Sequence, residues 1–140
     1  MRPDNPLAGR DRVRVRDLLS EPLIVMRAGY LMHRYVHRLL QGQVPSFPYA
    51  TDGAEMGKLM VAEGRGVTVL PDFSVIGDSL EQRGIITWRP ISGDHSQVQL
   101  VIQRIRSGSP PLATRDLHSI FVERARAYPV PPPALAAASR

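Results

Sequence analysis

The chain contains no cysteine, which excludes disulfides, zinc–thiolate sites and cysteine nucleophiles. No uninterrupted apolar run approaches the roughly 20 residues that cross a bilayer. Residues 1–6 are polar and broken by proline, so they do not resemble a secretory signal. We therefore expect a cytoplasmic protein that folds without disulfides.

Lysine is also nearly absent, because Lys58 is the single lysine among 18 lysine and arginine residues. The net charge of +5 permits binding to nucleic acid or attraction of acidic ligands. Enrichment in arginine follows equally from a GC-rich genome. The charge alone therefore does not decide between these explanations.

The length of 140 residues suits one domain, and the 43% hydrophobic content is ordinary for a globular protein. We expect an extended, charged lead-in over residues 1–16 and a folded region over 17–128. The Pro/Ala-rich residues 129–140 are typical of a disordered tail.

In the first half of the chain, strands alternate with helices. The apolar run 23–26 fits a buried strand, and apolar residues recur at helical spacing over residues 30–40. A short strand should end near Thr51. The spacing of Asp52 and Glu55 predicts a capping box, and the helix it starts should bury three residues: Met56, Leu59 and Met60.

The second half continues the alternation. Residues 67–70 resemble a buried strand, and 72–84 a short helix and loop with four inward residues: Phe73, Val75, Ile76 and Leu80. Residues 85–91 and 98–105 are rich in β-forming residues. A last helix should begin near Thr114, with an apolar stripe made of Leu117, Ile120, Phe121, Ala125 and Tyr128. This alternation predicts an α/β fold with a mostly parallel sheet flanked by helices.

Five segments, taken in order, resemble the effector-binding domain of LysR-type transcriptional regulators. They are NPLA (5–8), RVRDL (14–18), EPLI (21–24), MVAEGRGVTVLP (60–71) and LVIQR (100–104). A final amphipathic helix follows them. Each segment is weak alone, but their order and spacing make the combined match fairly specific.

The resemblance implies a lobe like those of periplasmic binding proteins, in which two α/β lobes hold a small-molecule effector between them. The chain matches lobe two, the hinge strands and the last helix, with an incomplete first lobe. The family's winged helix-turn-helix lies upstream of the matched part. We therefore expect contact with DNA only through a missing or separate domain, and association as a homo-oligomer or with a partner regulator subunit.

The family's effector contacts transfer to three places where strands meet helix N-termini. Ligands of open α/β sheets sit at the carboxyl ends of strands, and helix N-termini there favour carboxylates and other anions. The predicted effector is therefore a small metabolite of anionic character. The predicted effector-binding residues are Arg27, Ala28, Gly29, Thr51, Asp52, Gly53, Leu70, Pro71 and Asp72.

Each place also has a purely structural interpretation. Thr51 and Asp52 can simply cap a helix. Arg27 can be a solvated surface cation, and the glycines can serve only the turns. The segment 70–72 can pack at a strand end with no more than a backbone contact.

Metal binding and catalysis find little support in the sequence. His33 and His37 have the spacing of a helical metal site, but Arg34 and Arg38 flank them and no glutamate follows His33. There is no G-x-S-x-G elbow and no P-loop, and the glycines at 64 and 66 precede a strand. We expect no catalytic residues, no metal and no cofactor.

The sequence therefore favours a small-molecule effector-sensing module of a LysR-type regulator that lacks the helix-turn-helix domain. One alternative is a truncated interaction protein that oligomerises with a full-length regulator. Another is a basic nucleic-acid-binding protein that uses the arginine-rich segments 10–16 and 33–38.

Overall fold

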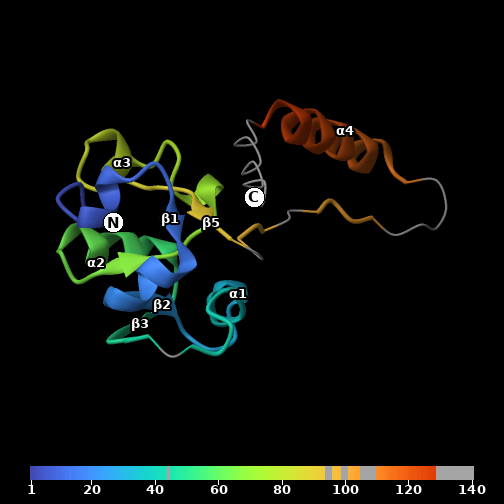
Figure 1. Ribbon diagram of the computed structural model, residues 1–140. Helices are drawn as coiled ribbons and strands as arrows, with labels where there is room; N and C mark the ends of the chain where they lie inside the picture. Colours follow the sequence, from blue (N-terminus) through green and yellow to red (C-terminus); the bar gives the residue numbers. More distant parts are fainter. Residues whose placement is uncertain (44, 94–95, 99–100, 105–109, 129–140) are drawn as a thin grey trace, which may run out of the picture. The chain divides into compact units, whose positions relative to one another are not determined.

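The computed structural model describes residues 1–43, 45–93, 96–98, 101–104 and 110–128 (Figure 1). The chain divides into two compact units, Met1–Val98 and Gln99–Arg140. The predicted tail, residues 129–140, lies outside the described residues.

A three-stranded sheet forms the centre of the first unit. Its strands are β2 (Leu23–Met26), β3 (Tyr49–Thr51) and β4 (Val67–Thr68), in the order β3-β2-β4. Both neighbours run parallel to β2, with Ile24 opposite Tyr49 on one side and Thr68 on the other. The predicted strands at 23–26 and near Thr51 are confirmed, and the strand predicted at 67–70 is shorter than expected.

The two faces of β2 pack against different helices. Leu23 belongs to a cluster with buried residues of α1 (Leu31–Leu39), whereas Ile24 packs with Val61 of α2 (Ala54–Ala62). Both Leu23 and Ile24 are only 1% exposed. A strand covered on both faces is apolar throughout, as expected in a parallel sheet.

Helix α1 agrees with its sequence prediction. It buries Met32, Tyr35, Val36 and Leu39, which recur at three- and four-residue spacing. The backbone then turns through left-handed conformations at Gln41 (φ 49°) and Gly42 (φ 77°). These residues therefore stop the helix in the way that a terminal glycine permits.

Helix α2 differs from its prediction at its start. Its N-cap is Gly53, with an extended φ of 176° and no capping side chain. The predicted capping box is therefore wrong. Asp52 does not cap the helix because its carboxylate pairs with Arg27, and the Glu55 carboxylate contacts Lys58.

The buried face of α2 is also rotated from the predicted one. Met56 and Leu59 are 53% and 50% exposed, whereas Gly57, Lys58 and Val61 are buried. A Cβ on Gly57 would lie 3.6 Å from the Thr68 hydroxyl oxygen of β4. The helix therefore approaches the sheet along its glycine side, and Val61, one turn later, follows Gly57 into the core.

A glycine is required where α2 returns to the sheet. Gly66 has a φ of 146°, and a Cβ on it would lie 2.1 Å from the Pro22 carbonyl oxygen. The same carbonyl accepts the N–H of Val67 at 3.0 Å. The close approach of the two backbones therefore starts the pairing of β4 with β2.

The connection after β4 contains a 3-10 helix, Asp72–Ser74, and α3 (Ser79–Gln82). This agrees with the predicted short helix and loop. Leu80 packs against the Ile24 cluster. Phe73 and Ile76 are 46% and 44% exposed, so their predicted inward orientation is wrong.

The strands predicted at 85–91 and 98–105 are largely absent from the described residues. In the described part of these stretches only β5 (Ile91–Ser92) forms, and it pairs in parallel with β1 (Val13–Arg14). Ile86 is instead buried outside any strand. The described residues 101–104 are not in a strand. A high β-propensity does not by itself supply the neighbouring strand that pairing requires.

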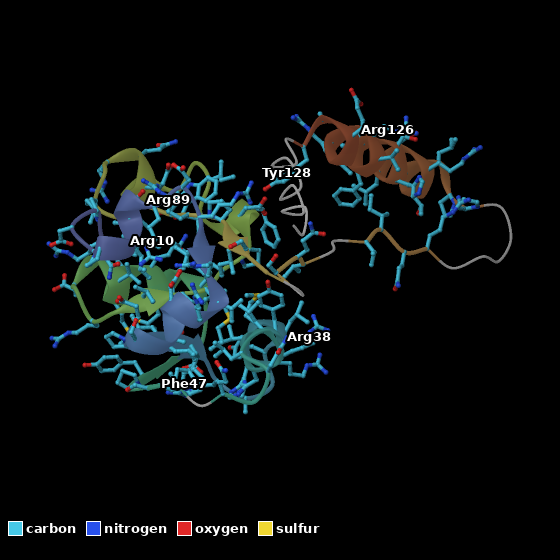
Figure 2. All side chains as sticks on the ribbon, in the orientation of Figure 1. Arg10, Arg38, Phe47, Arg89, Arg126 and Tyr128 are labelled. Atoms are coloured by element: carbon cyan, nitrogen blue, oxygen red, sulfur yellow. The ribbon has the colours of Figure 1, made fainter. Side chains whose placement is uncertain are left out.

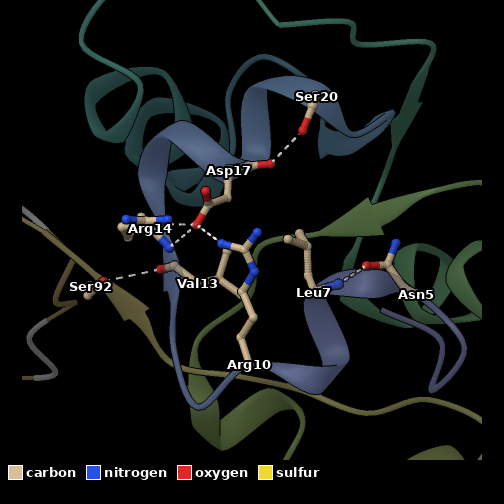
Figure 3. Close-up of polar contacts among 8 residues, drawn as sticks. All are labelled: Asn5, Leu7, Arg10, Val13, Arg14, Asp17, Ser20 and Ser92. Carbon is tan, nitrogen blue, oxygen red and sulfur yellow. Dashed lines mark hydrogen bonds and ion pairs between the residues drawn. The ribbon is translucent and has the colours of Figure 1, made fainter.

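Residues 1–16 are more structured than the expected extended lead-in. Pro6–Gly9 form a 3-10 helix, whose first turn is capped because the Asn5 Oδ1 accepts the Leu7 N–H at 2.8 Å (Figure 3). Leu7 and Val13 are 4% and 1% exposed. This segment therefore supplies part of the core.

A second 3-10 helix, Val15–Ser20, begins beside an arginine pair. The Asp17 carboxylate lies 2.7 Å from Arg10 and 3.3 Å from Arg14, and it accepts the Arg14 N–H (Figure 3). Desolvation by itself would raise the pKa of Asp17, but these hydrogen bonds and charges together hold that pKa below its usual value.

In the second unit, α4 spans Leu112–Ala127, as predicted from Thr114 onward. Three residues of its apolar stripe, Leu117, Ile120 and Phe121, are 52%, 53% and 51% exposed. The described part of this unit therefore leaves the stripe half open to solvent.

Candidate functional site

Three loops follow the three strands of the central sheet. Because β3, β2 and β4 are parallel neighbours, their carboxyl ends lie at the same edge. Residues 51–53 end β3 and lead into α2, residues 27–29 follow β2, and residues 70–72 come shortly after β4. We call these nine residues the carboxyl edge.

The loops after β2 and β3 are joined directly. The Arg27 Nη1 lies 3.1 Å from the Asp52 Oδ2, and the Arg27 N–H donates to the Thr51 carbonyl at 2.9 Å. The two charged side chains are 61% and 64% exposed. Both charged groups are therefore accessible to a ligand. An ion pair this exposed also contributes little to stability.

Thr51 has a different environment from its neighbours. It is 4% exposed, and its hydroxyl donates to the Gly53 carbonyl at 3.2 Å. This contact closes the turn into α2. The geometry thus gives Thr51 a structural role, and its predicted contact with an effector stays a prediction.

The backbone of the carboxyl edge is open at both helix starts. Ala28 and Gly29 are exposed, and Gly29 has a φ of 101°. Neither Tyr30, the N-cap of α1, nor Gly53, the N-cap of α2, makes a side-chain capping bond. The first N–H groups of both helices therefore lack the side-chain acceptor that usually satisfies one of them.

The third loop stands apart in its contacts. Pro71 is the N-cap of the following 3-10 helix, and the Asp72 Oδ1 accepts the Phe73 N–H at 2.8 Å. Among the described residues, no hydrogen bond or ion pair joins residues 70–72 to the other two loops. The sheet order, not a side-chain contact, places this loop beside them.

Lys58 is a buried charge that the sequence analysis missed. It is 2% exposed, and its ammonium contacts the Asp78 carboxylate, the Glu55 carboxylate at 2.8 Å and the Ser74 carbonyl at 3.1 Å. All three N–H donors of the ammonium thus have an acceptor. The only signal in the sequence was a lone lysine three residues after a helical glutamate.

The electrostatics of this cluster keep both partners charged. Desolvation alone would lower the pKa of Lys58, but the Asp78 and Glu55 carboxylates raise it above its usual value. The hydrogen bond from Lys58, followed by the Leu80 N–H, lowers the pKa of Asp78. Lys58 therefore ties the loop after β4 to helix α2, whose first turn adjoins the carboxyl edge.

The two histidines of α1 lie on its outer side. Their rings stack with centroids 4.3 Å apart. The His37 ring lies 5.2 Å from that of Phe47, which is labelled in Figure 2. No group of three or more His, Cys, Asp or Glu in the described part of the chain could hold a metal ion. The described residues also contain no helix both long and apolar enough to cross a membrane.

Two known proteins resemble parts of this chain. An uncharacterized HTH-type transcriptional regulator of Bacillus subtilis (strain 168), YybE, is 25% identical over 87 residues, which are 61% of this chain and 30% of the relative. The crystal structure of HinK, a LysR family transcriptional regulator from Pseudomonas aeruginosa, covers 51% of this chain and 26% of its own, with 25% identity and a TM-score of 0.44.

The broader comparison is with protein families. The family model of the LysR substrate binding domain matches residues 1–126. This match covers most of the chain and agrees with the parallel sheets flanked by helices. It confirms the predicted fold class, an α/β lobe like those of periplasmic binding proteins. The chain belongs to the family of LysR substrate-binding domains.

Proposed function

We propose that this chain is the effector-sensing module of a LysR-type transcriptional regulator, and that a small metabolite binds at the carboxyl edge. The single observation that carries the proposal is the contact between Arg27 and Asp52, which joins the loops after two adjacent parallel strands. A polar pair at the carboxyl ends of such strands lies where open α/β sheets bind ligands.

Each loop has a distinct role in this proposal. The Arg27 guanidinium binds an anionic group of the metabolite, and the exposed backbone at Ala28, Gly29 and Gly53 offers N–H groups to it. Asp52 and Asp72 bind its polar groups. Leu70 and Pro71 form an apolar border, whereas Thr51 holds the turn from beneath.

Chemical-shift mapping tests this assignment. Titration with a panel of small metabolites should move the amide signals of residues 27–29, 51–53 and 70–72 before others. Arg27→Gln should weaken binding, whereas Arg2→Gln is the matched control because Arg2 pairs with Asp4 at the same 3.1 Å, away from this edge. Binding that ignores Arg27 and moves other signals would refute the site.

Contact with DNA belongs to a separate domain in this proposal. The chain spans about 30% of the length of the curated relative it matches, which is named as an HTH-type regulator. A helix-turn-helix in the whole protein would read the promoter, in the cytoplasm, while this lobe senses the effector. Size measurement of the protein in its native cells tests the point, because a single 15.5 kDa species would contradict it.

A second candidate function is association with a full-length regulator of the same family. The half-exposed stripe of α4, with Leu117, Ile120 and Phe121, favours it because such residues bind partners through apolar contact. Co-purification with an intact regulator tests it. Phe121→Ser should abolish the association, whereas Arg124→Gln on the same helix should preserve it.

A further inference from the structure

The charges of the carboxyl edge differ from those of the whole chain. The chain carries a net charge of +5, yet this edge holds one cationic side chain, Arg27, and two carboxylates, Asp52 and Asp72. The edge is therefore mixed in charge, with a slight excess of negative groups. A purely anionic ligand is not what such an edge favours.

The geometry of the one cation sharpens this point. The Arg27 guanidinium already lies 3.1 Å from the Asp52 carboxylate. A ligand that carries only a carboxylate must share Arg27 with the Asp52 carboxylate or displace it, and in either case it lies beside that carboxylate. Like charges at this distance repel each other, so part of the attraction to Arg27 is lost.

A ligand with both charges avoids this conflict. Its carboxylate can contact Arg27 and the first N–H groups of α1 or α2, while its ammonium contacts Asp52. Each protein charge then keeps a partner of opposite sign. Space is available, because a Cβ on Gly29 or Gly53 would have no heavy atom within 4 Å.

We propose that the effector is a small zwitterion that carries a carboxylate and an ammonium group close together, as a free α-amino acid does. This proposal rests on the proposed function, since it names the ligand class of the same site. Arg27 selects the carboxylate, and Asp52 selects the ammonium. Asp72 adds negative potential from the neighbouring loop.

Calorimetric titration with matched compounds tests the ligand class. The probes are the twenty protein amino acids, the 2-oxo acid of each that binds, and its decarboxylated amine. An amino acid should bind more tightly than either of its partial analogues, because each analogue leaves one charge of the Arg27–Asp52 pair without a ligand group.

Two variants assign the roles. Asp52→Asn should weaken the binding of the amino acid about five-fold. The binding of its 2-oxo acid should stay equal or become tighter, since removal of the carboxylate also removes the repulsion. Arg27→Gln should weaken the binding of both compounds. Asp4→Asn is the matched control, because it removes a similarly exposed carboxylate from a 3.1 Å pair elsewhere, and it should change neither affinity.

The possible failures are distinguishable. A 2-oxo acid or dicarboxylate that binds more tightly than any amino acid, through Arg27, would overturn the zwitterion assignment and leave the effector site intact. Amino-acid binding that is unaffected by Asp52→Asn would also overturn it. Absence of binding by every probe and every metabolite of the mapping panel would overturn the proposed function itself.

Discussion

The Lys58 ammonium of helix α2 is buried against the Asp78 carboxylate at the N-cap of α3. The contact spans twenty residues of chain, and it encloses the loop that follows β4. Asp78 also caps α3, because its Oδ1 accepts the Leu80 N–H at 2.9 Å. One buried pair therefore links two helices and fixes the path of the chain after the carboxyl edge.

Removal of Lys58 should destabilise the lobe strongly. Lys58→Met keeps much of the side-chain volume but leaves Asp78 without its cation, and we expect a loss of about 3 kcal/mol in the free energy of unfolding. Urea denaturation measures it. Glu55→Gln is the control, because Glu55 contacts the same ammonium from an 81% exposed position and should cost under about 1 kcal/mol. Equal effects from the two variants would contradict the importance of the buried pair.

The same pair predicts how stability depends on pH. Because the pKa of Asp78 is lowered in the folded lobe, its contribution is present above the unfolded value of about 3.9. It is lost as the pH falls through the folded pKa. Because the pKa of Lys58 is raised, its contribution is present below the unfolded value of about 10.4 and is lost as the pH rises through the folded pKa.

The contribution of this pair to the unfolding free energy should therefore stay level near neutrality and decline below about pH 4. Denaturation midpoints measured between neutral and acidic pH check this. Asp78→Asn should reduce the acid decline without abolishing it, because the pKa of Asp17 is lowered too. A decline below about pH 4 that Asp78→Asn leaves unchanged would show that other groups control acid stability.

Gly66 should not tolerate any larger residue. Gly66→Ala would place a Cβ 2.1 Å from the Pro22 carbonyl in a backbone conformation that side chains rarely adopt. Strain of this kind costs about 2 kcal/mol or more. Gly9→Ala is the matched control, since its Cβ would meet nothing within 4 Å. Thermal unfolding of both variants tests the difference, and equal melting temperatures would mean that the chain relaxes around the methyl group.

Apolar patterns predicted the parts of the fold whose cores are made of large side chains. The run at Leu23–Met26 and the periodic residues of α1 are of this kind, and both elements lie within a residue or two of the prediction. The buried face of helix α2 was predicted wrongly because Gly57, which lies against Thr68 of the sheet, adds nothing to a hydrophobic pattern. The burial of Lys58 was missed for a related reason. A charged side chain is expected to lie in solvent unless the acceptors that would satisfy it are known.

The candidate site was predictable in position but not in chemistry. Alternating strands and helices place residues 27–29 and 51–53 at one edge, since parallel neighbours end together. The pairing of Arg27 with Asp52 depends on the strand register and on two rotamers, neither of which a sequence pattern specifies. That pairing changed the expected ligand from an anion to a zwitterion.

A substitution of Thr51 tests whether this residue has a structural role or contacts the ligand. Thr51→Val keeps the branched shape but removes the hydroxyl that donates to the Gly53 carbonyl, which should cost about 1 kcal/mol in unfolding free energy. Because the residue is 4% exposed and its hydroxyl already donates to the turn, we expect the affinity for an amino acid to change little. Denaturation and calorimetry of the same variant measure both quantities. Weaker binding with unchanged stability would reverse the assignment, because it would mean that the hydroxyl contacts the effector and not the turn.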